Sequence, residues 1–291
     1  MSLTEVIVRT GVGGRELRLD LTRPVSIAIP LDFSTDQPRH FGAPAASSRP
    51  FAVPGFSGSV TQGASCNCHT LTLIPHCNGT HTECVGHLTR EPLDAHRVVP
   101  LGLVPALLIS TEPSNARASG ESTEPVPKPT DLLITRQSLE KSWAAATATT
   151  AAAPMPTTAA APLQPRALVI RTLPNPVTKQ HQDYTSQTPP YLSRAAAEFL
   201  VERGIEHLVV DMPSIDRAHD EGRLTAHRIF FGLPSGDTTL AHATRAHATV
   251  TELAYISEAV TDGPYFLQLQ VPALGGDAVP SRPLLYPILS G

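Results

Sequence analysis

His76-Cys77-Asn78-Gly79-Thr80-His81-Thr82-Glu83-Cys84-Val85-Gly86-His87 is the stretch that decides how this sequence is interpreted. Within a dozen positions it holds three His, two Cys and one Glu, and most of these side chains bind borderline metals or transfer protons. A chance cluster of surface histidines is the alternative. Because five of the twelve His lie between 69 and 96, and all four Cys between 66 and 84, the density favours a metal or catalytic site.

The flanking pattern indicates how these side chains come together. Residues 69–74 alternate polar and apolar side chains, which predicts a half-buried strand running into the stretch. In an extended segment His81 and Glu83, two positions apart, point to the same face. An imidazole and a carboxylate would then converge, as a metal site requires.

Two residues compete to be the first ligand. Cys77 shares the parity of His81 and Glu83 in an extended chain, and a thiolate there would bind zinc at about 2.3 Å. Asn78-Gly79 can turn the backbone sharply, and Pro75 interrupts the strand, so a turn would bring His76 round instead. Parity favours Cys77, and both remain candidates.

Length and composition exclude several classes of protein. The chain has 291 residues, of which 41% are hydrophobic and 16% charged, which is typical of a soluble globular protein. A net charge of −4 offers no basic surface for nucleic acid, and no apolar run approaches the length of a membrane span. The N-terminus lacks a basic segment followed by an apolar one, so we expect a cytoplasmic protein with reduced thiols. A structural zinc site built from the four cysteines is a minor alternative.

The rest of the chain predicts a single α/β domain, residues 1–291, with insertions. Residues 34–65 are rich in Pro, Gly, Ser and Ala, which predicts a long loop that serves as a lid or pocket wall. We expect flexible insertions at about 112–130 and at 144–162, and between them a helix over 131–143 with Thr135 as N-cap. A strand at 166–172, a helix from Ser193 to Arg203 and a strand at 207–211 predict a βαβ unit.

Gly79-Thr80-His81-x-Glu83-x-x-x-His87 resembles the signature of the metal-dependent cyclase family, which includes bacterial kynurenine formamidases and isatin hydrolase-like enzymes. The family pattern is His-x-Gly-Thr-His-x-Asp-x-Pro-x-His. Four of its residues are kept in register here, at Gly79, Thr80, His81 and His87. Three positions differ, with Cys77 in place of the first His, Glu83 in place of Asp and Val85 in place of Pro.

The resemblance implies a swivelling β/β/α barrel-like fold and a site with one or two divalent ions. It adds a distant His and Glu as metal ligands, which fit His227 and Glu252, and His242 and His247 are more simply surface residues. Asp211-x-x-Ser214-x-Asp216 resembles another family segment, and we expect it to support the ligands. The implied metal ligands are therefore Cys77 or His76, His81, Glu83, His227 and Glu252.

These residues together indicate metal-assisted hydrolysis, with His87 as a proton shuttle. Mixed nitrogen and oxygen ligands suit zinc, manganese or iron, and a thiolate ligand would favour zinc. We expect zinc, with manganese as the alternative. The resemblance implies cleavage of an arylformamide of the N-formylkynurenine type, and a homodimer. The alternatives are a hydrolase of a lactam, lactone or other cyclic amide, and a metal-binding protein without turnover. We expect a small-molecule amide or lactam substrate and neither a nucleic-acid nor a membrane partner.

Overall fold

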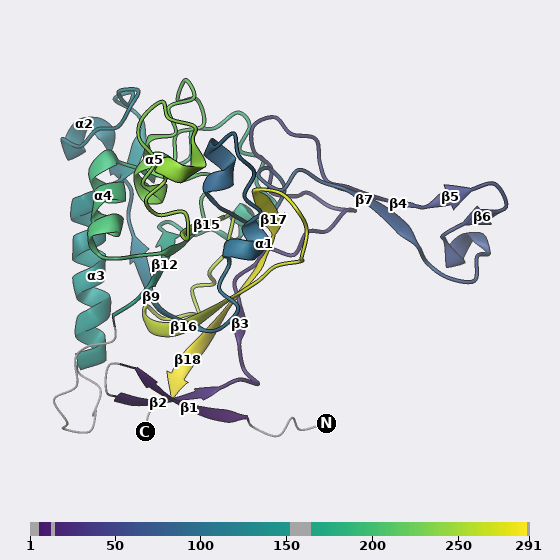
Figure 1. Cartoon of the computed structure of the whole chain (residues 1–291), viewed down its shortest axis with the longest axis horizontal. Coiled ribbons are helices and arrows are strands. Elements are labelled where there is room, and N and C mark those ends of the chain that lie inside the picture. The colour runs from purple at the N-terminus through teal and green to yellow at the C-terminus, as the bar shows by residue number, and fades with distance from the viewer. Residues whose placement is uncertain (1–5, 13–14, 152–163, 290–291) are drawn as a thin grey trace.

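The computed structural model describes residues 6–12, 15–151 and 164–289 and has a mixed α/β architecture built on one large sheet (Figure 1). The α/β class predicted from the sequence is confirmed. Ten strands of this 11-stranded sheet lie side by side in the order β1 (Ile7–Val12), β2 (Arg15–Asp20), β18 (Arg282–Leu289), β16 (Gly263–Gln270), β9 (Val104–Thr111), β12 (Ala167–Thr172), β14 (His207–Val210), β15 (Thr249–Glu252), β8 (His81–Glu83) and β17 (Ala278–Pro280).

The remaining strands are short. β3 (Val25–Ser26) pairs with β18 and completes the large sheet. Three smaller sheets consist of β10 (Ser114–Asn115), β11 (Leu132–Ile134) and β13 (Tyr191–Leu192), of β4 (Ser47–Pro50) and β7 (His69–Thr72), and of β5 (Ala52–Val53) and β6 (Phe56–Ser57). The helices are α1 (Ala95–Val98), α2 (Ala116–Ser119), α3 (Arg136–Ala151), α4 (Arg194–Glu202) and α5 (Thr225–Phe231), with 3₁₀ turns η1 (Val60–Gln62), η2 (Val85–Leu88), η3 (Val177–His181) and η4 (Leu240–His242).

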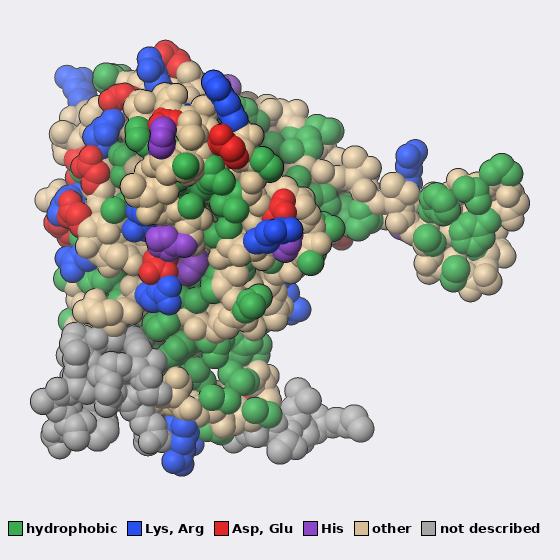
Figure 2. Space-filling view, in the orientation of Figure 1, with side chains coloured by type: hydrophobic (Ala, Val, Ile, Leu, Met, Phe, Trp, Pro, Cys, Tyr) green, Lys and Arg blue, Asp and Glu red, His purple; other side chains and the backbone are tan. Residues whose placement is uncertain are grey.

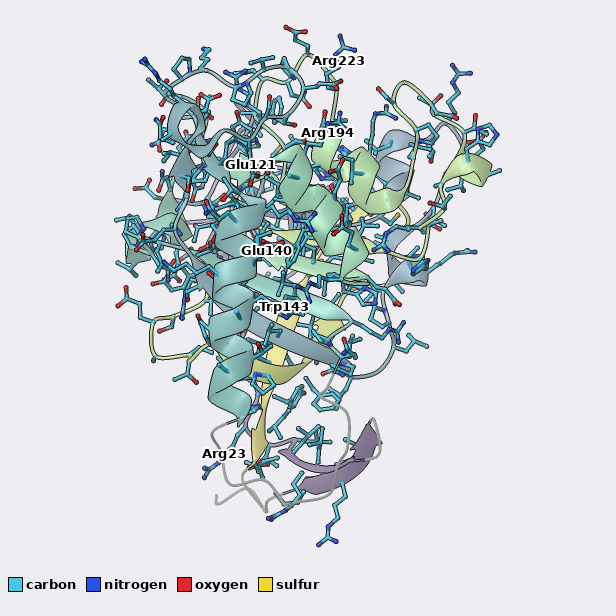
Figure 3. All side chains as sticks on the ribbon, turned by 90° about the vertical axis from the view of Figure 1, so that its left-hand side faces the viewer. Arg23, Glu121, Glu140, Trp143, Arg194 and Arg223 are labelled. Carbon is cyan, nitrogen blue, oxygen red and sulfur yellow. The ribbon has the colours of Figure 1, made fainter. Side chains whose placement is uncertain are left out.

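Four parallel strands, β9, β12, β14 and β15, form the centre of the large sheet and are buried on both faces. Leu168 and Ile170 of β12 belong to the core beneath the helices, whereas Val169 belongs to the core on the opposite face. Continuous apolar runs of this kind are typical of parallel strands covered on both sides. α3 and α4 lie together over one face, as Figures 1 and 3 show from two directions.

The predicted βαβ unit is present as β12, α4 and β14, with the two strands parallel and adjacent. The hydroxyl of Ser193 accepts a hydrogen bond from the backbone N–H of Ala196 at 3.0 Å and caps the helix. Gly204, at φ 72°, provides the left-handed turn that ends it. Local signals were therefore sufficient to place this unit.

The helix expected over 131–143 begins later, because β11 takes up residues 132–134. Thr135 nevertheless caps α3, since its hydroxyl accepts from the N–H of Ser138 at 3.0 Å. Leu139 is buried, and the Trp143 ring packs edge-on against Phe199 of α4 at 6.0 Å between centroids (Figure 3). α3 continues through 151 because Ala has the highest helix propensity. The rest of the insertion expected at 144–162 lies outside the described residues.

Residues 47–72, here called the arm, project from the body as a long β-structured extension (Figure 1). The sequence predicts a loop over 34–65, but the structure has strands there, since Ser47 pairs with Thr72 and Ala52 with Ser57. The pairing of Ser47 with Thr72 joins residues far apart in the sequence and leaves no local pattern, whereas β5 and β6 form a tight hairpin that turns at Pro54-Gly55. Apolar side chains gather at the end of the arm, among them the exposed Phe51, Val53 and Val60 (Figure 2).

Among the residues that the structure describes, no helix combines the length and apolar composition needed to cross a membrane.

Candidate metal centre

Strand β8 carries two of the predicted ligands and lies between β15 and β17. Its register sets His81 opposite Glu252 and Glu83 opposite Ala278. All three residues of β8 are buried, so the side chains that face the site from this strand are removed from solvent. The strand pairing therefore brings together ligands that lie far apart in the sequence.

Four buried side chains converge at this point: His81, Glu83, His227 and Glu252. His227 Nε2 lies 2.6 Å from Glu83 Oε1 and 3.5 Å from Glu252 Oε1. His81 Nε2 lies 3.5 Å from Glu252 Oε2. The structure thus gathers the His and Glu residues that the sequence singled out.

Three of the converging atoms have no well-formed hydrogen bond. His81 Nε2, Glu83 Oε1 and His227 Nε2 are buried and meet no hydrogen-bonding geometry within the described part of the chain, although the last two lie 2.6 Å apart as an ion pair. Buried polar atoms are almost always hydrogen-bonded, so several orphans at one point require an explanation. Nitrogen and carboxylate donors at one point are the ligands that zinc and related divalent ions prefer. The residues present therefore fit a divalent ion.

Asp216 holds His227 in position. Its carboxylate accepts hydrogen bonds from the backbone N–H of Ala226 at 2.8 Å and of His227 at 3.0 Å, at the start of α5. It also accepts from His227 Nδ1 at 2.8 Å. A carboxylate on Nδ1 fixes the ring and leaves Nε2 to face the site, which is the usual arrangement behind a metal-binding histidine.

Glu252 is held in place by a hydrogen bond to its carboxylate and by the constrained backbone of the residue that follows it. Its Oε1 accepts from the N–H of Ile215 at 2.8 Å. The next residue, Leu253, has φ 53°, a left-handed conformation that a branched side chain adopts only under constraint. Its carbonyl accepts from the Thr80 hydroxyl at 2.6 Å, which ties the Glu252 strand to the residue before His81. Strain of this kind is concentrated at functional sites.

His76 lies among the residues of the metal centre, whereas Cys77 does not. Residues 75–77 form a turn, so the parity argument that favoured Cys77 does not apply to them. His76 Nδ1 lies 2.9 Å from Glu83 Oε2, and His76 belongs to two groups of mutually close metal-ligating atoms. The groups found in the described chain contain no Cys77. Burial, and after it the charge of Glu252, raises the pKa of the Cys77 thiol.

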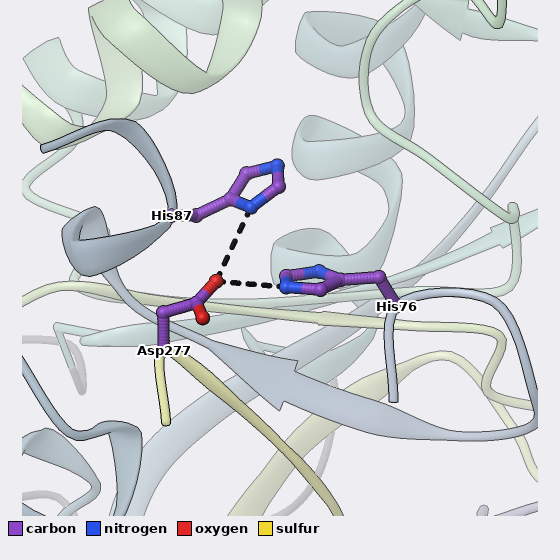
Figure 4. A group of neighbouring side chains, drawn as sticks. All are labelled: His76, His87 and Asp277. Atoms are coloured by element: carbon purple, nitrogen blue, oxygen red, sulfur yellow. Dashed lines mark hydrogen bonds and ion pairs between the residues drawn. The ribbon is translucent and has the colours of Figure 1, made fainter. Parts of the chain in front are cut away.

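Asp277 is a site residue that the sequence analysis missed. Its Oδ2 accepts hydrogen bonds from His76 Nε2 at 2.8 Å and from His87 Nδ1 at 3.3 Å (Figure 4). It comes directly before β17, whose pairing with β8 brings it beside Glu83. Only this long-range pairing identifies it, because Gly275-Gly276-Asp277 has the pattern of a simple turn.

The turn η2 presents His87 to the same region. The N–H of His87 bonds to the carbonyl of Cys84 at 3.0 Å. Gly86 is required here, because a Cβ on it would lie 2.5 Å from the carbonyl oxygen of Leu93. The His87 and His76 rings lie 4.2 Å apart between centroids.

The electrostatics of the centre keep its carboxylates charged. Burial raises the pKa of Glu83, but the charge of His227 outweighs it, and the net pKa lies well below the usual range. The pKa of Glu252 is also lowered, since His227 and His81 outweigh burial and the charge of Glu83. Burial lowers the pKa of His76, but Asp277 and Glu83 raise it to about 10. Because the carboxylates of Glu83 and Glu252 are both buried and charged, they favour binding of a cation between them.

The chain resembles known proteins both in sequence profile and in fold. The profile of the Cyclase family matches residues 19–217. A solved structure described as a potential metal-dependent hydrolase with cyclase activity superposes with a TM-score of 0.55 at 16% identity, over 91% of this chain and 97% of that one. No curated protein sequence matches the chain.

Two further solved structures have the same fold. A predicted metal-dependent hydrolase from Bacillus stearothermophilus gives a TM-score of 0.53 at 14% identity, covering 91% of this chain and 98% of that one. Isatin hydrolase A from Labrenzia aggregata gives 0.53 at 16% identity, covering 92% and 94%. At these identities the likeness shows the fold alone.

Proposed function

Because the chain belongs to the Cyclase family, we propose that it is a metal-dependent hydrolase that cleaves the amide bond of a small arylformamide, as in N-formylkynurenine. One observation carries the proposal. His81 Nε2, Glu83 Oε1 and His227 Nε2 are buried and converge with Glu252, and apart from the close contact of 2.6 Å between His227 Nε2 and Glu83 Oε1 they have no well-formed hydrogen bond within the described chain.

In this proposal His81, Glu83, His227 and Glu252 hold the ion, which we take to be zinc, with His76 as a further candidate on the second oxygen of Glu83. A divalent ion bound there acidifies a water molecule toward neutral pH and polarises the carbonyl of the substrate. Asp216 keeps His227 oriented throughout, because it accepts from the ring nitrogen that faces away from the site.

His87 is the group that moves protons. Asp277 accepts from its Nδ1, and its Nε2 makes no hydrogen bond to any part of the chain that the structure describes. An imidazole held by a carboxylate in this way can take a proton from water at Nε2 and deliver it to the leaving nitrogen. Its ring lies 5.9 Å from that of His227 between centroids, beside the proposed ligands and apart from them.

A second candidate is hydrolysis of a cyclic amide. Three solved structures with this fold are described as isatin hydrolases, one of them with a product analogue bound. A lactam and a formamide need the same parts, namely an activated water and a proton for the leaving nitrogen. The two candidates differ only in the pocket that receives the substrate.

The test is turnover of a panel by protein stripped of metal and then reloaded. N-formylkynurenine, isatin and an aromatic lactone are each supplied to the stripped protein, to the zinc-loaded protein and to the manganese-loaded protein. The proposal expects hydrolysis of N-formylkynurenine only with metal, and the second candidate expects isatin to be opened faster. Loss of activity in Glu83→Gln, with a matched control at exposed Cys66→Ser, ties turnover to the centre. No turnover of any compound at any loading contradicts both candidates.

We further propose that the protein acts as a homodimer, as the family resemblance implies. Exposed apolar side chains at the end of the arm give one chain a surface to bury against another. Light scattering on the purified protein distinguishes a dimer from a monomer.

A further inference from the structure

His40 is a buried histidine whose ring nitrogens have no hydrogen-bond partner. Only 3% of its surface is exposed, and neither Nδ1 nor Nε2 makes a hydrogen bond within the described chain. Elsewhere a buried histidine is paired, as His207 is with the Thr249 hydroxyl at 2.9 Å. Burying a polar ring with both nitrogens unsatisfied costs free energy of folding, so such a ring is retained for a reason other than stability.

His40 borders the metal centre. Its backbone N–H bonds to the carbonyl of Cys77 at 3.2 Å, next to the candidate ligand His76. The charges of Glu252 and His81 both act on its ring. Burial lowers the pKa of His40 despite the opposing effect of Glu252, so the ring is neutral and offers one donor and one acceptor.

The segment that carries His40 is held by side-chain hydrogen bonds of its neighbours. The side-chain amide of Gln37 donates to the carbonyl of Ala46 at 3.0 Å and accepts from its N–H at 2.9 Å, which closes the loop around His40. Arg39 is held by Asp183 at 2.6 Å. These contacts fix the backbone on either side of His40.

The residue after His40 carries a second signal. Phe41 has φ 57°, a strained left-handed conformation for an aromatic residue, yet 62% of it is exposed. Its ring packs edge-on against the His40 ring at 4.7 Å and lies 6.1 Å from that of His219, between centroids. Strain that exposes an apolar ring beside an unpartnered imidazole indicates a place prepared for a ligand.

We propose that His40 is a substrate-binding residue of this site, which donates a ring N–H to the oxygen of the substrate's amide and then of the carboxylate formed from it. Phe41 contributes an aromatic face beside it, which selects an aryl substrate. This inference rests on the proposed hydrolase function and names residues that bind its substrate.

The experiment compares His40→Phe with His40→Gln in the metal-loaded full-length protein. Phenylalanine keeps the volume of the ring and removes both nitrogens, whereas glutamine retains an N–H donor. Three quantities are measured for each: kcat/KM for whichever of N-formylkynurenine and isatin the wild type hydrolyses faster, metal content, and the midpoint of thermal unfolding without substrate. His247→Phe, an exposed histidine outside the segment that carries His40, is the control.

Loss of one hydrogen bond to the substrate predicts kcat/KM about tenfold lower in His40→Phe. The same variant should keep its metal, and its unfolding midpoint should be equal or higher, because an unsatisfied polar group has been removed. His40→Gln should recover most of the activity. Unchanged kcat/KM in His40→Phe overturns the inference, and so does a lower unfolding midpoint or lost metal in both variants, which indicates a structural role. A wild type that hydrolyses neither compound overturns the proposed function, and this inference with it.

Discussion

Substitution of Asp216 by Asn tests how the centre is held. Oδ1 accepts from the N–H of Ala226, and Oδ2 accepts from both the N–H and Nδ1 of His227. Asparagine has one carbonyl oxygen, which can serve His227, and its amide NH2 must then face the N–H of Ala226. The N–H of Ala226 is then a buried donor without an acceptor, and the two hydrogen bonds from His227 lose their charged acceptor. Together these changes lower the free energy of unfolding by about 3 kcal/mol. Weakened orientation of a ligand histidine lowers metal affinity about 10- to 100-fold.

Two measurements on each protein separate these effects. Urea unfolding of the metal-free protein gives the stability, and competition with a chromophoric chelator gives the zinc affinity. Asp220→Asn is the matched control, because Asp220 is also buried and accepts two backbone N–H groups just before α5, from Gly222 and Leu224. We expect both variants to lose stability and only Asp216→Asn to lose zinc affinity. Equal zinc affinity in the two variants would refute the role given to Asp216.

Three further predictions concern other residues. His87→Ala should lower kcat about 10²- to 10⁴-fold with its metal content unchanged, and a metal-free variant would make His87 a ligand. His76→Ala should weaken zinc binding more than Cys77→Ala in metal titrations, because the turn at 75–77 directs His76 to Glu83; the opposite order restores Cys77 as first ligand. Burial lowers the pKa of His207 to about 4, so between this pH and about 6.5 the unfolded state binds more protons and stability falls as the pH falls. The loss in the free energy of unfolding reaches about 3 kcal/mol near pH 4. When urea unfolding is measured across this pH window, the free energy of unfolding of His207→Gln should fall less steeply with pH than that of the wild type. An equal slope contradicts this prediction.

Local patterns in the sequence were enough for the fold class and part of the site. The strand at 166–172 and the capped helix after Ser193 are recognisable from short stretches, and together they predict the βαβ unit. His81 and Glu83 share a buried strand, as their spacing predicts. Features that depend on a few neighbouring residues can therefore be predicted from the sequence.

What the sequence could not predict depends on pairing between distant residues. Asp277 joins the site only because β17 pairs with β8, and its own neighbours resemble an ordinary turn. His40 becomes notable only when its burial and its lack of partners are known. The β4–β7 pairing in the arm is hidden by a loop-like composition, since these two strands lie far apart in the sequence. No local pattern carries such information.

Elemental analysis of the purified protein, after incubation with zinc or manganese and removal of excess ion, tests the central claim most directly. The account predicts about one divalent ion retained per chain, and its loss in Glu83→Gln, because Glu83 contacts His227 through Oε1 and His76 through Oε2. A wild-type protein that retains neither ion, or a Glu83→Gln variant that retains as much as the wild type, would contradict it.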